Sequence, residues 1–168
     1  TESAIVVKDL KKSYGDFIGV NEISFEVLSG EIFALLGANG AGKTTTLEIL
    51  EGHRNRTSGD VTVLGYDPEK KDQNMSMRVG IVLQETGIEP YLKVEEVLKQ
   101  FSGFYNNPRN ITEVIEATGL KGQIKTPVRK LSGGQRRRVD VALGLIGDPD
   151  LIFLDEPTTG FDPSARRD

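Results

Sequence analysis

The chain has 168 residues, a length that fits one domain with a sizeable hydrophobic core. Its net charge of -4 and pI near 5.2 argue against a generic nucleic-acid binder, and the lack of cysteine excludes disulfides and thiolate metal sites. The longest apolar runs, at 32–38 and 141–147, have seven residues each. A membrane-spanning helix needs roughly 20, and the first residues lack the layout of a signal peptide, so a membrane role would require a partner chain.

Strand-like and helix-like segments alternate along the chain, which favours an α/β fold. The first half predicts two paired strands over 4–10 and 18–27 and a short buried strand over 31–37. A helix over 43–52, which ends at Gly52, and two more strands over 59–65 and 78–84 follow. From about Lys93 the pattern is helical, and Asn110 with Glu113 forms a helix-start signal. Helices are predicted over 94–105, 110–120 and 132–147, before a last buried strand at 150–156.

These elements predict a single domain over 1–168 with a helical insertion. Residues 1–86 and 149–168 are expected to form an N-terminal antiparallel β-subdomain and an α/β core. Residues 87–148 are expected to form a helical subdomain.

The segment GANGAGKT at 37–44 matches the P-loop pattern, with an apolar run before it and a predicted helix after it. Its glycines permit backbone angles that point successive N–H groups into one concavity, and the helix start adds its positive dipole end. Lys43 is predicted to reach the β- and γ-phosphates of a nucleotide, Thr44 to ligate Mg²⁺ and Thr45 to touch the α-phosphate. The other loop residues expected to bind the nucleotide are Gly37, Asn39, Gly40, Ala41 and Gly42. The alternative is a glycine-rich turn with an incidental lysine, which the matching flanks disfavour.

The run LIFLDE at 151–156 supplies an acidic partner for the P-loop. Because four apolar residues keep this strand buried, Asp155 is expected at the carboxyl edge of the sheet, where α/β proteins bind ligands. Asp155 is predicted to hold Mg²⁺ through water. Glu156, which faces another direction, is predicted to polarise a water for in-line attack on the γ-phosphate. The alternative is a strand that ends in a solvated acidic turn.

The segment LSGGQRRR at 131–138 begins the longest predicted helix. Ser132 and Gln135 make a Ser-x-x-Gln capping box, yet two glycines in a first helical turn are unfavourable by about 1 kcal/mol each relative to alanine. Bare N–H groups at a positive helix end explain these glycines if a phosphate must come close. The three arginines at 136–138 are interpreted as a solvated face; the alternative is that they contact a phosphate or a partner.

With these three motifs the chain resembles the ATP-binding domain of ABC transporters, whose signature is LSGGQ, over nearly all of its length. The resemblance implies that the α/β core is a P-loop NTPase (RecA-like) core. It also implies a head-to-tail dimer with ATP held between the P-loop of one domain and the signature of the other. The signature residues that it assigns to the nucleotide are Ser132, Gly133, Gly134 and Gln135. Gly160 and Asp162 match the family's D-loop, which crosses the dimer interface.

Two further positions follow from the resemblance. Tyr14 stands where the family stacks an aromatic ring on adenine; the alternative is an exposed hairpin tyrosine. Gln84 matches the Q-loop, which senses the γ-phosphate and Mg²⁺ and links to an integral membrane subunit; the alternative is a polar loop residue. The resemblance thus gives a catalytic set of Lys43, Gln84 and Glu156 and a metal set of Thr44, Gln84 and Asp155.

The family's switch histidine has no counterpart in this sequence. His53, the only histidine, comes too early and is interpreted as a surface residue. The chain as written is therefore expected to be C-terminally incomplete, and to bind MgATP but hydrolyse it poorly.

The favoured hypothesis is the ATP-hydrolysing subunit of an exporter, held at the cytoplasmic face of the cell membrane through a membrane subunit. The runs QETGIEPYLKVEEVL and LDEPTTGFDPSARR resemble the branch that serves drug and lipid efflux. The alternatives are a soluble ABC-type ATPase acting on nucleic acid or ribosomes, and a nucleotide-gated interaction module without catalysis. A GTPase is disfavoured because no Asn-Lys-x-Asp motif is present.

Overall fold

The computed structural model describes residues 2–82 and 87–154. The chain forms two compact units, Thr1–Ser76 and Met77–Asp168, and each is described by itself. The predicted borders of the helical subdomain are not tested by this division and stay a prediction.

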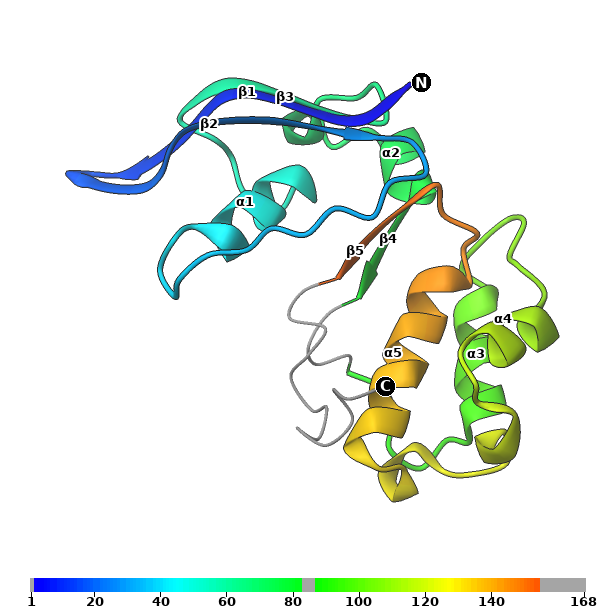
Figure 1. The fold of residues 1–168 in the computed structure, drawn as a ribbon. Coiled ribbons are helices and arrows are strands. Elements are labelled where there is room, and N and C mark those ends of the chain that lie inside the picture. Colours follow the sequence, from blue (N-terminus) through cyan, green and yellow to red (C-terminus); the bar gives the residue numbers. More distant parts are fainter. Residues whose placement is uncertain (1, 83–86, 155–168) are drawn as a thin grey trace. The chain divides into compact units, whose positions relative to one another are not determined.

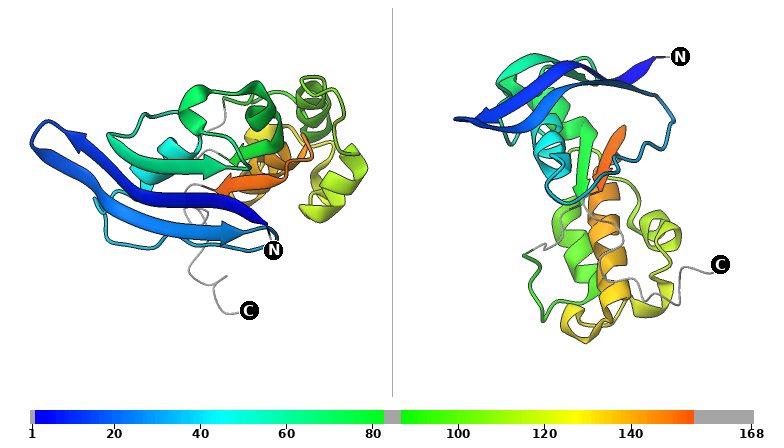
Figure 2. Two further views of the ribbon diagram at one scale, coloured as in Figure 1. Left: turned by 90° about the horizontal axis from the view of Figure 1, so that it is seen from above. Right: turned by 60° about the vertical axis from the view of Figure 1, so that its left-hand side comes forward.

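The first unit is built on a three-stranded antiparallel sheet with the order β2-β1-β3 (Figure 2). Strand β1 (Ser3–Tyr14) pairs with β2 (Phe17–Leu28) through a tight hairpin and with β3 (Ser58–Val63) on its other edge. Gly15, with φ of +60°, makes the hairpin turn. The three predicted strands are confirmed. The buried side chains of this sheet are apolar: Ala4, Ile5, Val7, Leu10, Val20, Val27, Val61 and Val63.

Helix α1 (Lys43–Leu50) lies against this sheet, in contact with β2 and β3 (Figure 1). Ile49 and Leu50 are its buried apolar residues. The helix ends at the predicted stop, because Gly52 adopts a φ of +77° and its N–H donates to the carbonyl of Ile49. Strand β3 follows α1 in the chain, and after β3 come the short turn η1 (Pro68–Lys70) and helix α2 (Gln73–Arg78).

The predicted buried strand at 31–37 is wrong. No described residue forms a strand ladder with this segment, and the side chains of Ile32 and Leu36 are 99% and 88% exposed. The segment is apolar, but a strand also needs a neighbouring strand to pair with its backbone N–H and C=O groups. Within the first unit, the paired strands β1, β2 and β3 do not extend to this segment.

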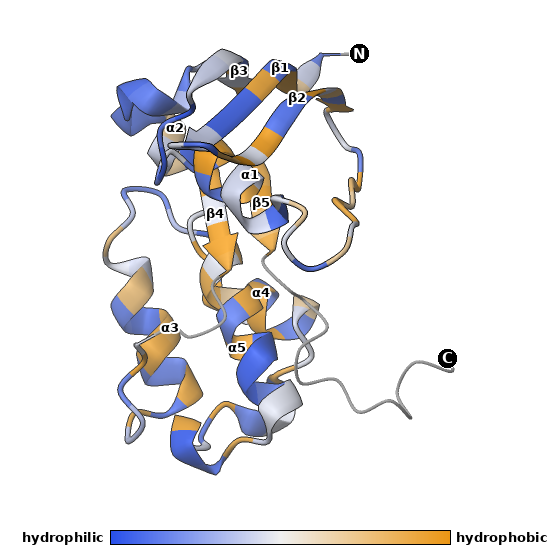
Figure 3. Cartoon of the chain, turned by 90° about the vertical axis from the view of Figure 1, so that its left-hand side faces the viewer, coloured by the Kyte–Doolittle hydropathy of each residue, from blue (hydrophilic) through white to orange (hydrophobic). Residues whose placement is uncertain are grey.

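The second unit combines a parallel strand pair with a helical layer. The two strands predicted at 78–84 and 150–156 are confirmed as β4 (Val79–Val82) and β5 (Leu151–Leu154). They form a parallel pair with Val79 opposite Leu151, a pairing that the sequence did not predict, and both are hydrophobic along most of their length (Figure 3). Helix α5 (Gly133–Leu145) packs on β4 at very short range: a Cβ on Gly80 would lie 2.4 Å from the carbonyl oxygen of Gly144. These glycines therefore bring helix and strand backbones together.

Helices α3 (Val94–Ser102) and α4 (Ile111–Ala117) pack with α5 around an apolar core. The three predicted helices are confirmed, and the Asn110 side chain accepts from the N–H of Thr112 as an N-cap. The turns η2 (Lys121–Gln123) and η3 (Val128–Lys130) lead into α5. The fully buried core residues are Val94, Val97, Leu98, Val114, Leu120, Val128, Val139, Ala142 and Ile146.

Over residues 2–82 and 87–154, no helix has both the length and the apolar character that crossing a membrane requires. This agrees with the short apolar runs of the sequence.

Candidate nucleotide-binding site

The predicted P-loop runs directly into α1, and two of its glycines adopt left-handed backbone angles. Gly40 has a φ of +82° and Gly42 a φ of +81°. Gly42 also lies against β2, where an added Cβ would sit 2.3 Å from the carbonyl oxygen of Gly19. Since L side chains rarely adopt this angle and no space exists for a Cβ, only glycine fits position 42. The loop geometry thus depends on a backbone contact with the hairpin.

Lys43, the first residue of α1, points back over the start of the loop. Its Nζ donates to the carbonyl oxygens of Gly37 at 2.6 Å and Ala38 at 2.7 Å. The ammonium group is therefore held at the start of the loop, and the first turn of α1 contains no acidic residue. An anion placed here would meet a cation and a positive helix end together.

The three threonines after Lys43 differ in burial. Thr44 is exposed and Thr45 is half-buried, so both hydroxyls lie at or near the surface. Thr46 is buried, and its Oγ1 donates to the carbonyl of Gly42 at 2.8 Å. The sequence did not predict this role of Thr46, which is to hold the N-terminus of α1 to the loop.

Tyr14 ends β1 and lies opposite Phe17 across the hairpin, with their rings stacked at 6.4 Å. Its side chain is 42% exposed, and two cations lie over the ring: Lys12 Nζ at 5.2 Å and Arg54 Cζ at 5.6 Å from the centroid. A tyrosine with an accessible ring is suited to stack on a flat base.

The signature begins α5 in the second unit with the predicted capping box. Gln135 N–H donates to Ser132 Oγ at 3.2 Å, and Ser132 N–H donates to Gln135 Oε1 at 3.0 Å. No described atom lies within 4 Å of a Cβ added to Gly133 or Gly134. The first turn of α5 is thus capped by its own side chains, and its two glycines leave open space around the backbone.

The interpretation of residues 136–138 as a solvated face is wrong for one of the three. Arg136 and Arg138 are exposed, but Arg137 is only 8% exposed. Asp140, one helical turn further along α5, is also buried. The side chains of Arg137 and Asp140 both have interaction partners. A run of like charges on a helix cannot all face solvent, because successive residues turn by about 100°.

Several predicted site residues lie outside the described residues: Gln84, Asp155, Glu156, Gly160 and Asp162. Their roles stay predictions. In the part of the chain that the structure describes, no group of three His, Asp or Glu side chains is placed to hold a metal ion.

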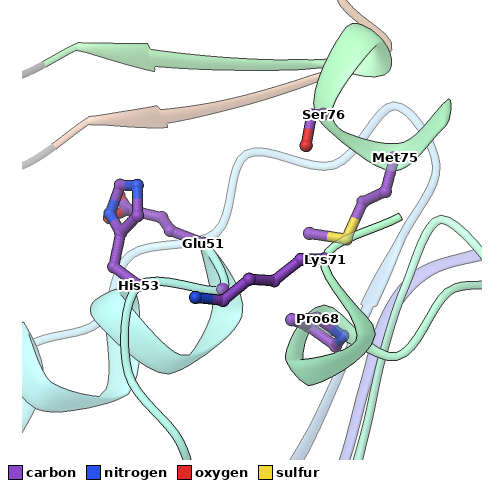
Figure 4. Close-up of a pocket in the computed structure, with 7 residues that line it drawn as sticks. Glu51, His53, Pro68, Lys71, Met75 and Ser76 are labelled. Atoms are coloured by element: carbon purple, nitrogen blue, oxygen red, sulfur yellow. The ribbon is translucent and has the colours of Figure 1, made fainter. Parts of the chain in front are cut away.

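A shallow pocket of about 290 Å³ lies at the other end of α1 from the P-loop (Figure 4). His53 pairs with Glu51 at 3.2 Å beside it, and Lys71 extends across it toward that pair. The predicted surface position of His53 is confirmed, since its side chain is 58% exposed. The eight residues of α1 separate this pocket from the loop by about 12 Å, so it is not the phosphate site.

The segment that returns from α1 to β3 is fixed by an arginine fork. Arg56 donates to both carboxylate oxygens of Asp67, at 2.8 and 3.0 Å, and to the carbonyl of Gly59. The hydrogen bond from Arg56 holds the pKa of the Asp67 carboxyl below its usual value. Asp67 also raises the pKa of the Arg56 guanidinium, so the pair stays ionised at neutral pH.

A glycine loop that wraps a lysine at a helix start, joined to an α/β architecture, defines the class of P-loop NTPases. The family model "ABC transporter" matches residues 20–159. The chain belongs to this family, as an ATP-binding domain.

Relatives and solved structures agree with this assignment. The chain is 41% identical, over 95% of its length, to the Nod factor export ATP-binding protein I of Cupriavidus pinatubonensis, and covers 51% of that protein. It is 38% identical, over 99% of its length, to the probable multidrug ABC transporter ATP-binding protein YbhF of Escherichia coli, and covers 30% of it. The structure of cbiO1 from Clostridium perfringens, part of the ABC transporter complex cbiONQ, matches with a TM-score of 0.83 and 25% identity over 98% of this chain and 69% of that one.

Proposed function

We propose that this chain is the ATP-binding part of a transporter subunit that binds and hydrolyses MgATP in a head-to-tail dimer. The observation that carries the proposal is the P-loop, in which Lys43 is held to the carbonyls of Gly37 and Ala38 at the start of an uncapped helix. This arrangement concentrates positive charge where the β- and γ-phosphates would lie. The loop residues Gly37, Asn39, Gly40, Ala41, Gly42, Thr44 and Thr45 complete the cradle.

The chemistry of the donor groups fits Mg²⁺. Thr44 offers an exposed hydroxyl at the first turn of α1, and Asp155 and Gln84 would add further oxygen ligands, the type that Mg²⁺ prefers. When bound, Mg²⁺ neutralises the phosphate charge that builds up during transfer. Glu156 would polarise the attacking water, Gln84 would contact the γ-phosphate, and Lys43 would stabilise the charge on the leaving group.

The signature supports the dimer. Gly133 and Gly134 lie in a helical turn that does not need glycine for its own packing, and their N–H groups stand at a positive helix end. Glycine there is explained if Ser132, Gly133, Gly134 and Gln135 contact the nucleotide bound to a second copy or a related domain. Tyr14 would stack on the adenine of that nucleotide.

We further propose that the whole protein drives export through a separate integral membrane subunit, from the cytoplasmic face of the cell membrane. The support is that two relatives are named for Nod factor export and for multidrug transport. Drugs or lipids are the substrate classes that we infer. The chain spans about half the length of the Nod factor relative.

The test is ATP turnover by the full-length protein against its concentration, for the wild type and for Glu156→Gln. Turnover is expected to rise more than linearly with concentration, because the site is complete only in the dimer. Glu156→Gln is expected to lower turnover by about 10²–10⁴-fold while ATP binding persists.

Lys43→Ala is the matched control and should lose ATP binding itself. Full turnover in Glu156→Gln, or strictly linear dependence on concentration, would contradict the catalytic assignment or the dimer, respectively.

A further inference from the structure

The ring of Tyr14 is joined to the phosphate-binding helix by one side chain, that of Arg54. The Arg54 guanidinium lies over the Tyr14 ring, 5.6 Å from its centroid. Its Nε donates to Glu48 Oε2 at 2.5 Å, and Glu48 belongs to α1, the helix that the P-loop begins. The chain of contacts therefore runs from Tyr14 through Arg54 to α1.

Glu48 holds Arg54 in this position through both its carboxylate and its backbone carbonyl. The backbone N–H of Arg54 donates to the carbonyl of Glu48 at 3.1 Å, directly after the stop at Gly52. The hydrogen bond that Arg54 donates to Glu48 also raises the pKa of the guanidinium above its ordinary value, so the cation persists at any physiological pH. A planar guanidinium that is fixed by a carboxylate can lie flat on an aromatic ring with little loss of side-chain freedom.

The backbone just before Tyr14 is attached to the segment that returns from α1. Thr57 N–H donates to the carbonyl of Lys11 at 2.8 Å, and Ser13 N–H donates to Thr57 Oγ1 at 2.9 Å. The Tyr14 ring itself lies over Gly19, which has no side chain to hold it. The orientation of the ring thus depends on Phe17 and on the two cations above it.

We propose that Arg54 is a positioning residue for adenine: anchored by Glu48, it fixes the Tyr14 ring relative to the P-loop, so that one rigid site takes base and phosphates together. This inference rests on the proposed function, because it assumes that Tyr14 stacks on the base. The physical gain is pre-organisation, since a ring that is already oriented loses less freedom when the base binds. A cation over the ring also draws electron density from it, which favours stacking on an electron-rich purine.

The proposal predicts that base binding and phosphate binding respond differently to Arg54. In the full-length protein, Arg54→Ala should weaken ATP binding by roughly two- to fivefold, the size of one exposed cation–π contact. Inorganic tripolyphosphate has the phosphates but no base. Its dissociation constant should therefore change no more in Arg54→Ala than it does in Lys12→Ala. Lys12→Ala is the matched control, because it removes an equal charge over the same ring without touching the link to α1.

Glu48→Gln separates positioning from simple charge. This variant keeps the Arg54 side chain but removes the carboxylate that anchors it. Because one negative charge is lost, electrostatics alone would tighten the binding of ATP and of tripolyphosphate alike. Positioning predicts the opposite for ATP, a weakening in the same direction as Arg54→Ala, because the guanidinium loses its anchor. In a Tyr14→Ala background, Arg54→Ala should have no further effect on ATP.

The measurement is the dissociation constant of each ligand, ATP and tripolyphosphate, by isothermal titration calorimetry in the presence of Mg²⁺. Thermal unfolding checks that each variant is folded. Unchanged or tighter ATP binding in Arg54→Ala and Glu48→Gln would overturn the inference; a tightening would mean that the arginine obstructs the ring. The proposed function would survive that result if Lys43→Ala still abolished binding. Wild-type protein that binds neither ligand would overturn both.

Discussion

The P-loop and the signature each lie at the start of a helix and contain glycines, and the two helix starts are stabilised in different ways. The P-loop uses left-handed angles at Gly40 and Gly42 and a close backbone contact with β2, and its N-cap has no side chain to offer. The signature uses a reciprocal pair of side-chain hydrogen bonds between Ser132 and Gln135.

This comparison separates a glycine that the fold requires from two glycines that it does not require. Glycine at position 42 is required by the fold of its own unit, because a Cβ would collide with β2. Glycines 133 and 134 meet no described atom within 4 Å, so the fold around them does not require them. A residue that folding does not require, in a place where it weakens a helix, is best explained by a ligand.

The strongest test of this contrast is Gly42→Ala. We expect the free energy of unfolding to fall by at least about 2 kcal/mol, because left-handed strain in an L residue adds to the collision with the Gly19 carbonyl. Urea unfolding of the full-length protein measures it. Gly40→Ala is the control: φ is again positive, but no described atom lies within 4 Å of its Cβ, so only the strain of about 1–2 kcal/mol remains. Equal losses in the two variants would mean that the contact with β2 is unimportant.

The second test concerns the segment that returns from α1, which the Arg56 fork secures. Asp67→Asn should lower the free energy of unfolding by about 1 kcal/mol at pH 7, because Arg56 loses the nearer of its two carboxylate partners, Asp67 and Glu69. The pKa of Asp67 is lower in the folded than in the unfolded protein. Its contribution is therefore complete above the unfolded pKa of about 3.9 and is lost as the pH falls through the folded pKa.

The measurement is unfolding free energy against pH for wild type and variant. The two curves should be separate at neutral pH and converge in acid. Asp16→Asn, in the exposed hairpin turn where asparagine is equally suitable, should leave the curve unchanged. A separation that is constant down to pH 2 would contradict the assignment to this ion pair.

The smallest effect on stability, and the most informative, is expected from Gly134→Ala. Alanine should stabilise the protein by about 0.5–1 kcal/mol, because the methyl group meets open space and the unfolded chain loses freedom. ATP turnover should nevertheless fall, by about 10²-fold, if a phosphate of the partner's nucleotide approaches this backbone. Thermal unfolding and turnover are measured on the same preparation. A variant that is more stable and fully active would show that the signature glycines have no ligand to admit.

Much of the local structure could be predicted from the sequence. The helices α1, α3, α4 and α5, the hairpin of β1 and β2, the stop at Gly52 and the Ser132–Gln135 box are all confirmed. Each depends on residues within a few positions of one another, through periodicity, capping or a positive φ at glycine.

What the sequence could not decide were contacts between residues far apart in the chain. The exposure of Ile32 and Leu36, the burial of Arg137 and the Arg54–Tyr14 contact are of this kind. An apolar run predicts a buried strand only if a partner strand is at hand, and the sequence does not say which segments meet.

The sequence by itself determined the identity of the phosphate loop and of the signature, because their glycines, lysine and capping residues act locally. Only the tertiary structure decided why Gly42 must be glycine and that Arg54 lies over the ring of Tyr14. The reason is physical: collisions and cation–π contacts arise where the chain folds back on itself, at distances that sequence spacing does not specify.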